Sequence, residues 1–142
     1  MTDEDRGKLI VQLIRHEGIR LEPYLDSVGK WTIGVGRNLT DKGISDDEAR
    51  FLLENDLDEC ISDCQSFPWF AGLDGVRQRV VVDLRFNLGG AGLRRFKRTL
   101  AYVASGDFEL AAAALLDSKW SRQVKTRATR LAEMLRTGLD PV

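Results

Sequence analysis

One short stretch with strand character, in a chain that is otherwise helical in period, constrains the fold most strongly. Within residues 21–35, Pro23 is unsuited to a helix interior, and Ser-Val-Gly-Lys at 27–30 is suited to a turn. The flanking segments PYLD and WTIGVG contain β-branched and aromatic residues. This pattern predicts a β-hairpin, and the chain as a whole is predicted to be a mostly helical α+β protein.

Helical periodicity precedes the hairpin. Apolar residues recur at helical spacing through residues 3–16, and either Thr2 or Asp3 can cap the helix that they predict. Gly18 is expected to end this helix, since glycine readily adopts the backbone conformation of a C-terminal cap.

Helices also follow the hairpin. Ser45 and Glu48 have the spacing of a capping box, and the helical period then runs to about Cys64, a length of about 30 Å. Residues 66–70 are predicted to be a loop. Further helices are predicted over residues 75–88, 93–104, 107–117 and 125–136, with breaks at 89–92, 105–107 and 118–123.

The length of 142 residues fits one domain. We predict a small hairpin lobe over about 17–45 and a linking helix over about 45–65. A larger helical lobe is expected over about 66–142, together with the N-terminal helix. A ligand is expected to bind in a cleft between the two lobes.

Charge is distributed unevenly along the chain. Residues 1–66 contain 15 acids and 8 bases, and residues 67–142 contain 7 acids and 13 bases, so the halves carry −7 and +6. The basic half could attract an anionic partner, either nucleic acid or a cell-wall polymer. Within it, the run Arg94, Arg95, Lys97 and Arg98 is either a solvated helix face or part of that attraction.

Several classes of protein are disfavoured by composition. Cys60 and Cys64 are four residues apart, a spacing that suits a disulfide badly on a helix, so both are predicted to be reduced core residues. A metal site would need more ligands, and His16 is the only histidine, so no metal is expected. No cofactor is expected either. No apolar run reaches 18 residues, and the charged opening segment does not resemble a signal peptide, so we expect a cytoplasmic protein without membrane insertion.

Two acids flank the first half of the hairpin, Glu17 at the end of the first helix and Asp26 beside the turn. Such acids are usually solvated surface residues. Alternatively, the helix dipole and the apolar neighbours Ile14 and Ile19 would disfavour the charged form of Glu17, while Asp26 stays ionised. Two carboxyl groups in different environments are what a glycosidase requires.

The segment HEGIRLEPYLDSVGKWTIGVG closely resembles the catalytic signature of tailed-phage lysozymes, the endolysins of glycoside hydrolase family 24. Their pattern is Glu, eight residues, Asp, five residues, Thr, and it is met by Glu17, Asp26 and Thr32. The resemblance extends to DEARFLLENDL at 47–57, FNLG at 86–89, SKWSRQVKTRATR at 118–130 and RTG at 136–138.

The resemblance implies a lysozyme-like fold and a role for each signature residue. Glu17 would protonate the glycosidic oxygen between N-acetylmuramic acid and N-acetylglucosamine. Asp26 would stabilise positive charge at the anomeric carbon and help to activate water, which the Thr32 hydroxyl would position as donor and acceptor. Inversion is implied, with the carboxyl groups roughly 6.5 to 9.5 Å apart.

Further positions match the family. Tyr24, Phe86 and Thr99 correspond to the wall or lining of the saccharide cleft, although simple packing explains each equally well. Arg127 matches the arginine that pairs with the catalytic Glu, and its charge would favour the ionised acid.

Two more matches and one departure concern the surroundings of the site. Asn87 and Trp120 would meet behind Glu17 as support. Arg37 stands where some relatives carry histidine, and it could instead pair with an acid of the next helix. The segment 37–45 is short for the family, which implies a more open cleft.

The resemblance favours a monomeric peptidoglycan hydrolase that lyses the host cell. It would wait in the host cytoplasm until a separate holin-type protein gives it access to the wall. The alternatives are a lytic transglycosylase acting on the same bond and a catalytically silent wall-binding module. Nucleic acid is not an expected partner, because no recognised binding motif is present and the bases lack aromatic interleaving.

Overall fold

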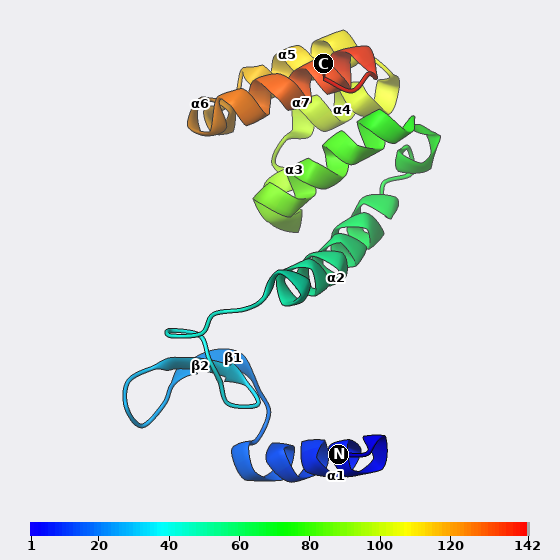
Figure 1. Cartoon of the computed structure of the whole chain (residues 1–142). Coiled ribbons are helices and arrows are strands. Elements are labelled where there is room, and N and C mark those ends of the chain that lie inside the picture. Colours follow the sequence, from blue (N-terminus) through cyan, green and yellow to red (C-terminus); the bar gives the residue numbers. More distant parts are fainter. Residues whose placement is uncertain (142) are drawn as a thin grey trace. The chain divides into compact units, whose positions relative to one another are not determined.

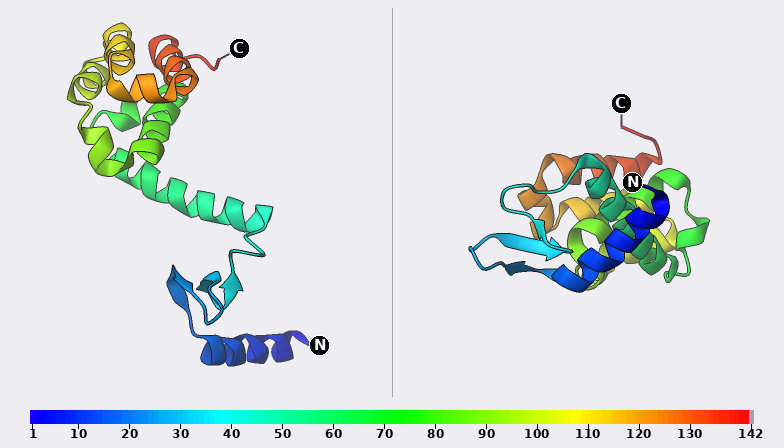
Figure 2. Two further views of the ribbon diagram at one scale, coloured as in Figure 1. Left: turned by 90° about the vertical axis from the view of Figure 1, so that its left-hand side faces the viewer. Right: turned by 60° about the horizontal axis from the view of Figure 1, so that its bottom comes forward.

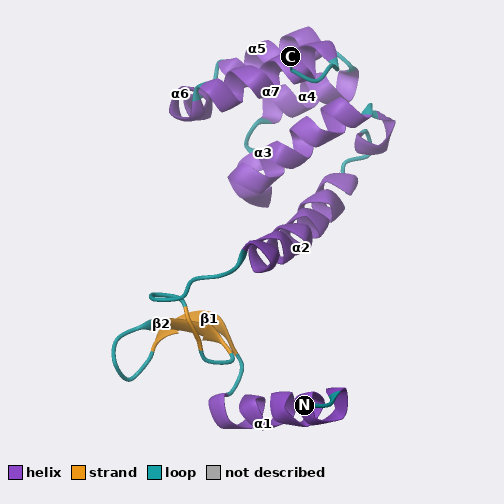
Figure 3. Cartoon of the chain, in the orientation of Figure 1, coloured by secondary structure: helices purple, strands orange, loops and turns teal. Residues whose placement is uncertain are grey.

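The computed structural model describes residues 1–141 and divides into two compact units, Met1–Phe51 and a second unit that begins at Leu52. Helices make up most of the chain, and the single sheet lies in the first unit (Figure 3). These observations confirm the predicted α+β class. Helix α2, Asp46–Gln65, includes the boundary between the units. No helix within residues 1–141 combines the length and apolarity needed to cross a membrane.

Helix α1, Asp3–Glu17, begins and ends at residues that the sequence indicates. Thr2 is the N-cap, and its hydroxyl accepts a hydrogen bond of 3.1 Å from the main-chain nitrogen of Asp5. Gly18 ends the helix with a φ of 75°, and its nitrogen donates to the Ile14 carbonyl at 2.8 Å. The predicted first helix is therefore confirmed.

The sheet contains three antiparallel strands in the order β1-β2-β3. Their bounds are β1 Arg20–Leu25, β2 Trp31–Gly34 and β3 Arg37–Asn38. Strands β1 and β2 form the predicted hairpin (Figure 1), with Tyr24 opposite Thr32. The register shifts between Tyr24 and Arg20, and Arg20 lies opposite Gly34. Strand β3 was not predicted, because two residues carry no detectable strand pattern.

The N-terminus of α2 is fixed by a reciprocal capping box and by Arg37. The Ser45 nitrogen donates to Glu48 Oε1 at 3.0 Å, and the Glu48 nitrogen donates to Ser45 Oγ at 3.1 Å. Arg37 pairs with the Glu48 carboxylate at 2.8 Å, which confirms the expected pairing with an acid of the next helix. The hydrogen bond from Arg37 is the largest of the contributions that lower the pKa of Glu48 to about 2.

The second unit is a bundle of helices. They are the 3-10 turn Phe70–Gly72, α3 Gly75–Arg94, α4 Lys97–Ser105, α5 Phe108–Leu116, α6 Lys119–Val124 and α7 Thr126–Thr137. Helix α5 packs against both α4 and α7, and Figure 2 shows these yellow-to-red helices gathered together. Four leucines of this bundle are almost completely buried: Leu84 and Leu93 on α3, Leu115 on α5 and Leu135 on α7.

One predicted break in this unit needs correction, and another is shorter than expected. Residues 118–123 were expected to be irregular, but they begin α6, which Ser118 caps by accepting a hydrogen bond from the Ser121 nitrogen. Burial of Trp120 anchors this short helix in the core. The predicted break at 89–92 is found at its first residue, Gly89, whose φ of 74° is not helical, and a second helical segment of α3 then continues to Arg94.

Both cysteines are free and buried, as predicted. Cys64 has no exposed surface, and its burial raises the pKa of the thiol to about 11, so the reactive thiolate is disfavoured. Leu53 and Ile61 on the same helix are exposed.

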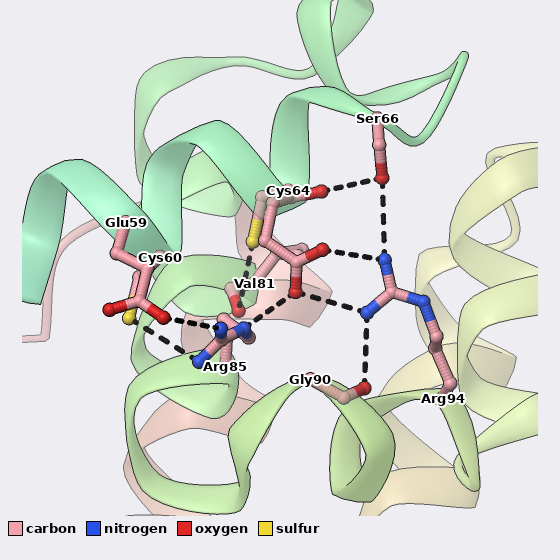
Figure 4. Close-up of polar contacts among 9 residues, drawn as sticks. Glu59, Cys60, Cys64, Ser66, Val81, Arg85, Gly90 and Arg94 are labelled. Carbon is pink, nitrogen blue, oxygen red and sulfur yellow. Dashed lines mark hydrogen bonds and ion pairs between the residues drawn. The ribbon is translucent and has the colours of Figure 1, made fainter.

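An ion-pair network joins α2 to α3 inside the second unit (Figure 4). Asp63 accepts hydrogen bonds from Arg85 Nε at 2.6 Å and from Arg94 Nη2 at 2.7 Å. Arg94 also donates to the Gly90 carbonyl at 3.0 Å, just after the kink. The arginine contacts lower the pKa of Asp63 to about 2. Arg94, the first residue of the predicted basic run, is therefore engaged within the fold.

Replacing Asp63 with asparagine should lower the free energy of unfolding by about 2 kcal/mol at pH 7. The native carboxylate has a lowered pKa, so its contribution is present above the unfolded pKa of about 4 and is lost as the pH falls toward 2. Chemical denaturation of wild type and Asp63→Asn across this pH range measures the difference. Asp58→Asn, an exposed change on the same helix, is the control. A difference that does not shrink in acid would contradict the role of the ionised pair.

Candidate active site

Asp26 follows β1 and is held by the turn that leads to β2. Its Oδ1 accepts hydrogen bonds from the main-chain nitrogens of Val28 at 2.9 Å and Lys30 at 2.8 Å. The Asp26 nitrogen donates to the Lys30 carbonyl at 2.9 Å. Within residues 1–51, hydrogen bonds to this carboxylate engage Oδ1 alone, so Oδ2 is left for other contacts.

Thr32 lies on β2 with only 4% of its surface exposed. Its hydroxyl donates to the Lys30 carbonyl at 3.0 Å, the same carbonyl that accepts from Asp26. The main chain of Lys30 therefore connects Asp26 with Thr32. Because the hydroxyl proton is used in this bond, Thr32 presents only acceptor lone pairs to a further ligand.

Glu17 is the last residue of α1, and its side chain lies against Gly36 in the turn between β2 and β3. A Cβ atom built on Gly36 would lie 3.1 Å from Glu17 Oε2 and 3.4 Å from its carboxyl carbon. The pairing of Arg20 with Gly34 explains this contact. Because the two chain segments are antiparallel, the residues before Arg20 lie near the residues after Gly34, which brings Glu17 close to Gly36.

The partial burial expected for Glu17 is not found in this unit. The residue is exposed, and the Ile19 side chain, expected to cover it, is itself 54% exposed. Gly18 turns the chain sharply after the helix, so the residues that follow enter β1 and do not fold back over the acid.

One strand thus connects the three signature residues. Residues just before β2 hold Asp26, β2 itself contains Thr32, and the turn after β2 contacts Glu17. Two carboxyl groups and a hydroxyl held on or beside one small sheet can supply a proton, an anion and an acceptor for water.

Tyr24 is opposite Thr32 in the sheet register and is half-buried. The guanidinium carbon of Arg20 lies 4.3 Å from the centre of its ring, so an intramolecular cation–π contact covers part of one face. Its predicted role at the hairpin wall stays a prediction.

The remaining predicted residues lie in the second unit. Trp120 Nε1 donates to Asn87 Oδ1 at 2.7 Å, so the expected meeting of these two side chains is found. Phe86 is exposed, whereas Thr99 is buried with 4% of its surface accessible and offers little area to a saccharide.

Arg127 binds Asp83, a partner that the sequence did not indicate. The Asp83 Oδ1 atom accepts from Arg127 Nη2 at 2.6 Å and from Nε at 3.0 Å. Asp83 is a single acid within the apolar stretch Val80–Leu84, and a lone charge in such a run could have been recognised as needing a cation.

Asp83, Phe86 and Arg127 line a groove of about 800 Å³ in the second unit. Its walls are mainly apolar and include Leu57 and Phe70. No group of three or more His, Cys, Asp or Glu side chains within residues 1–141 is arranged to hold a metal ion.

Comparison with known proteins adds the decisive observation, because the family model described as phage lysozyme matches residues 14–136. The chain belongs to the phage lysozyme family. The match includes the signature residues 17–32 and both units. Phage lysozymes are glycoside hydrolases that degrade peptidoglycan, and this assignment agrees with the predicted enzyme class.

Curated relatives of this phage lysozyme differ in length. The pre-baseplate central spike protein Gp5 of Enterobacteria phage T4 is 28% identical over 167 residues, which cover 96% of this chain but 29% of the spike protein. Probable T4-type lysozymes 1 and 2 of Dictyostelium discoideum are 24% and 26% identical, over 86% of this chain and 89% of each relative. The chain thus spans less than a third of the spike protein and most of the two lysozymes.

The contribution of the Asp26 carboxylate to this turn can be tested with two variants, one that removes its hydrogen bonds and one that removes only its charge. In Asp26→Ala, amide exchange at Lys30 and Val28 should accelerate roughly tenfold or more, because hydrogen bonds to a charged group contribute about 1.5 to 3 kcal/mol. Asp26→Asn retains an acceptor oxygen and should keep most of the protection. Amide hydrogen exchange followed by NMR measures both variants, and equal protection in the two would contradict this account of the turn.

Proposed function

We propose that this lysozyme hydrolyses the β-1,4 bond between N-acetylmuramic acid and N-acetylglucosamine, with inversion at the anomeric carbon. The observation that carries the proposal is that contacts on and beside β2 hold both Asp26 and Glu17, with Thr32 on the strand itself. Family membership supports the substrate, and the signature spacing supports the assignment of roles.

In the proposed reaction Glu17 is the general acid. Its carboxyl proton passes to the glycosidic oxygen as the bond between that oxygen and the anomeric carbon breaks. The free Oδ2 atom of Asp26 faces the positive charge that develops on the sugar and accepts a proton from the attacking water. Because the bond from water to carbon forms on the opposite face, the configuration inverts.

Thr32 positions the water through its acceptor lone pairs. The hydroxyl proton is donated to the Lys30 carbonyl, so a water molecule beside Thr32 must donate to it. If the other proton of that water points to Asp26, both protons are engaged and an oxygen lone pair remains for the anomeric carbon. This proposal refines the sequence-based role, in which the hydroxyl was expected both to donate and to accept.

The biological role is also a proposal. We infer that the enzyme lyses the host at the end of a phage cycle as a monomer. It reaches peptidoglycan from the host cytoplasm after a holin-type protein permeabilises the membrane. Membership of the phage lysozyme family and the match to most of two T4-type lysozymes support a wall-degrading role.

Glu17→Gln should reduce lysis of permeabilised Gram-negative cells by about 10² to 10⁴-fold, because the amide cannot transfer the required proton. Loss of turbidity with time measures the rate. Glu22→Gln is a matched control, since Glu22 is an exposed acid on β1 of the same unit. Similar lysis rates for wild type and Glu17→Gln would reject Glu17 as the acid.

The products distinguish hydrolysis from transglycosylation. Digestion of purified sacculi in ¹⁸O-labelled water should place one labelled oxygen at the new reducing end of N-acetylmuramic acid, as detected by mass spectrometry. A lytic transglycosylase would instead give an unlabelled 1,6-anhydro sugar that is lighter by one water. NMR during the first minutes should show the α-anomer, and initial formation of the β-anomer would contradict inversion.

A further inference from the structure

We propose that Gly36 is a positioning residue for the general acid, because its lack of a side chain leaves the notch in which the Glu17 carboxyl group lies. This inference rests on the proposed role of Glu17. It assigns a function to a glycine in the turn between β2 and β3 that the catalytic pattern of Glu17, Asp26 and Thr32 does not include.

Contact distances at Gly36 carry the inference. A Cβ atom there would lie 3.1 Å from Glu17 Oε2, 3.4 Å from the carboxyl carbon and 3.6 Å from Cγ. The whole end of the acid, and not only one oxygen, therefore lies over the glycine. Within residues 1–51 no hydrogen bond or ion pair restrains the Glu17 carboxylate, so van der Waals contact with Gly36 limits where it can lie.

A methyl group at this position should move the acid more than it destabilises the fold. The contacted atoms belong to the end of an exposed side chain, which can shift by a few tenths of an ångström at little cost. Proton transfer is sensitive to such a shift, because the donor must lie within hydrogen-bond reach of the glycosidic oxygen. Stability and activity should therefore respond differently.

Gly34, the last residue of β2, provides a matched comparison two residues before Gly36. Its φ of 68° is close to the 65° of Gly36, so alanine meets a similar backbone cost at either position. A Cβ atom on Gly34, however, would have no neighbouring atom within 4 Å. The two alanine variants therefore share strain in the backbone and differ in the contact with Glu17.

The test compares Gly36→Ala with Gly34→Ala in the full chain. We expect similar thermal unfolding temperatures, but a kcat on solubilised glycan strands about tenfold lower for Gly36→Ala, with little difference in KM. The carboxyl ¹³C resonance of Glu17, identified by its loss in Glu17→Gln, should shift only in Gly36→Ala. This resonance reports the position of the acid independently of catalysis.

A second pair, Gly36→Asn and Gly34→Asn, covers the case in which alanine prevents folding, since asparagine tolerates positive φ better than other side chains. Equal kcat values within the pairs, or a Glu17 resonance that shifts equally in both, would overturn the positioning role. An active Glu17→Gln enzyme would instead refute the proposed acid, and the resonance would still show whether Gly36 fixes its position.

Discussion

The main-chain amide and carbonyl of Lys30 form the interaction on which the candidate site depends. The nitrogen donates to the Asp26 carboxylate, and the carbonyl accepts from both the Asp26 nitrogen and the Thr32 hydroxyl. Main-chain groups make these bonds, so the arrangement does not require a lysine at this position. The Lys30 side chain pairs with Asp41 instead. One residue thereby fixes the Asp26 carboxylate and the Thr32 hydroxyl relative to each other.

This arrangement is built on a very small sheet. An isolated two-stranded hairpin is marginally stable in water, so the short strand β2 needs support from outside the β1–β2 pair. Strand β3 supplies part of it, and the bond from Arg37 to Glu48 connects β3 to the first turn of α2. The Glu48 carboxylate has a pKa lowered to about 2, so its ion pair with Arg37 persists in mildly acidic solution. Acid that protonates ordinary carboxyl groups would therefore leave this support in place.

The sequence predicts well what depends on local patterns. Thr2, Gly18 and the pair Ser45–Glu48 fix helix ends through contacts within a few residues, and all three are found as expected. Long-range pairing is different. Asp83 binds Arg127 across 44 residues, and a helix pattern alone cannot choose among the acids available to one arginine. Helix α6 was missed for a related reason, because burial of Trp120 stabilises a six-residue helix whose polar residues favour a break.

The residues of the candidate site are close together in the sequence, which bears on the different proteins in which such a domain occurs. Glu17, Asp26, Thr32 and the contacts that hold them all fall within residues 17–36. These contacts are hydrogen bonds to the main chain and a van der Waals contact with a glycine. Such a site depends little on what is joined to either end of the domain. The relatives fit this view, since a similar sequence occupies less than a third of a phage spike protein and most of two T4-type lysozymes. The proposed chemistry is therefore expected to depend on residues 17–36, and the biological role on the surroundings of the domain.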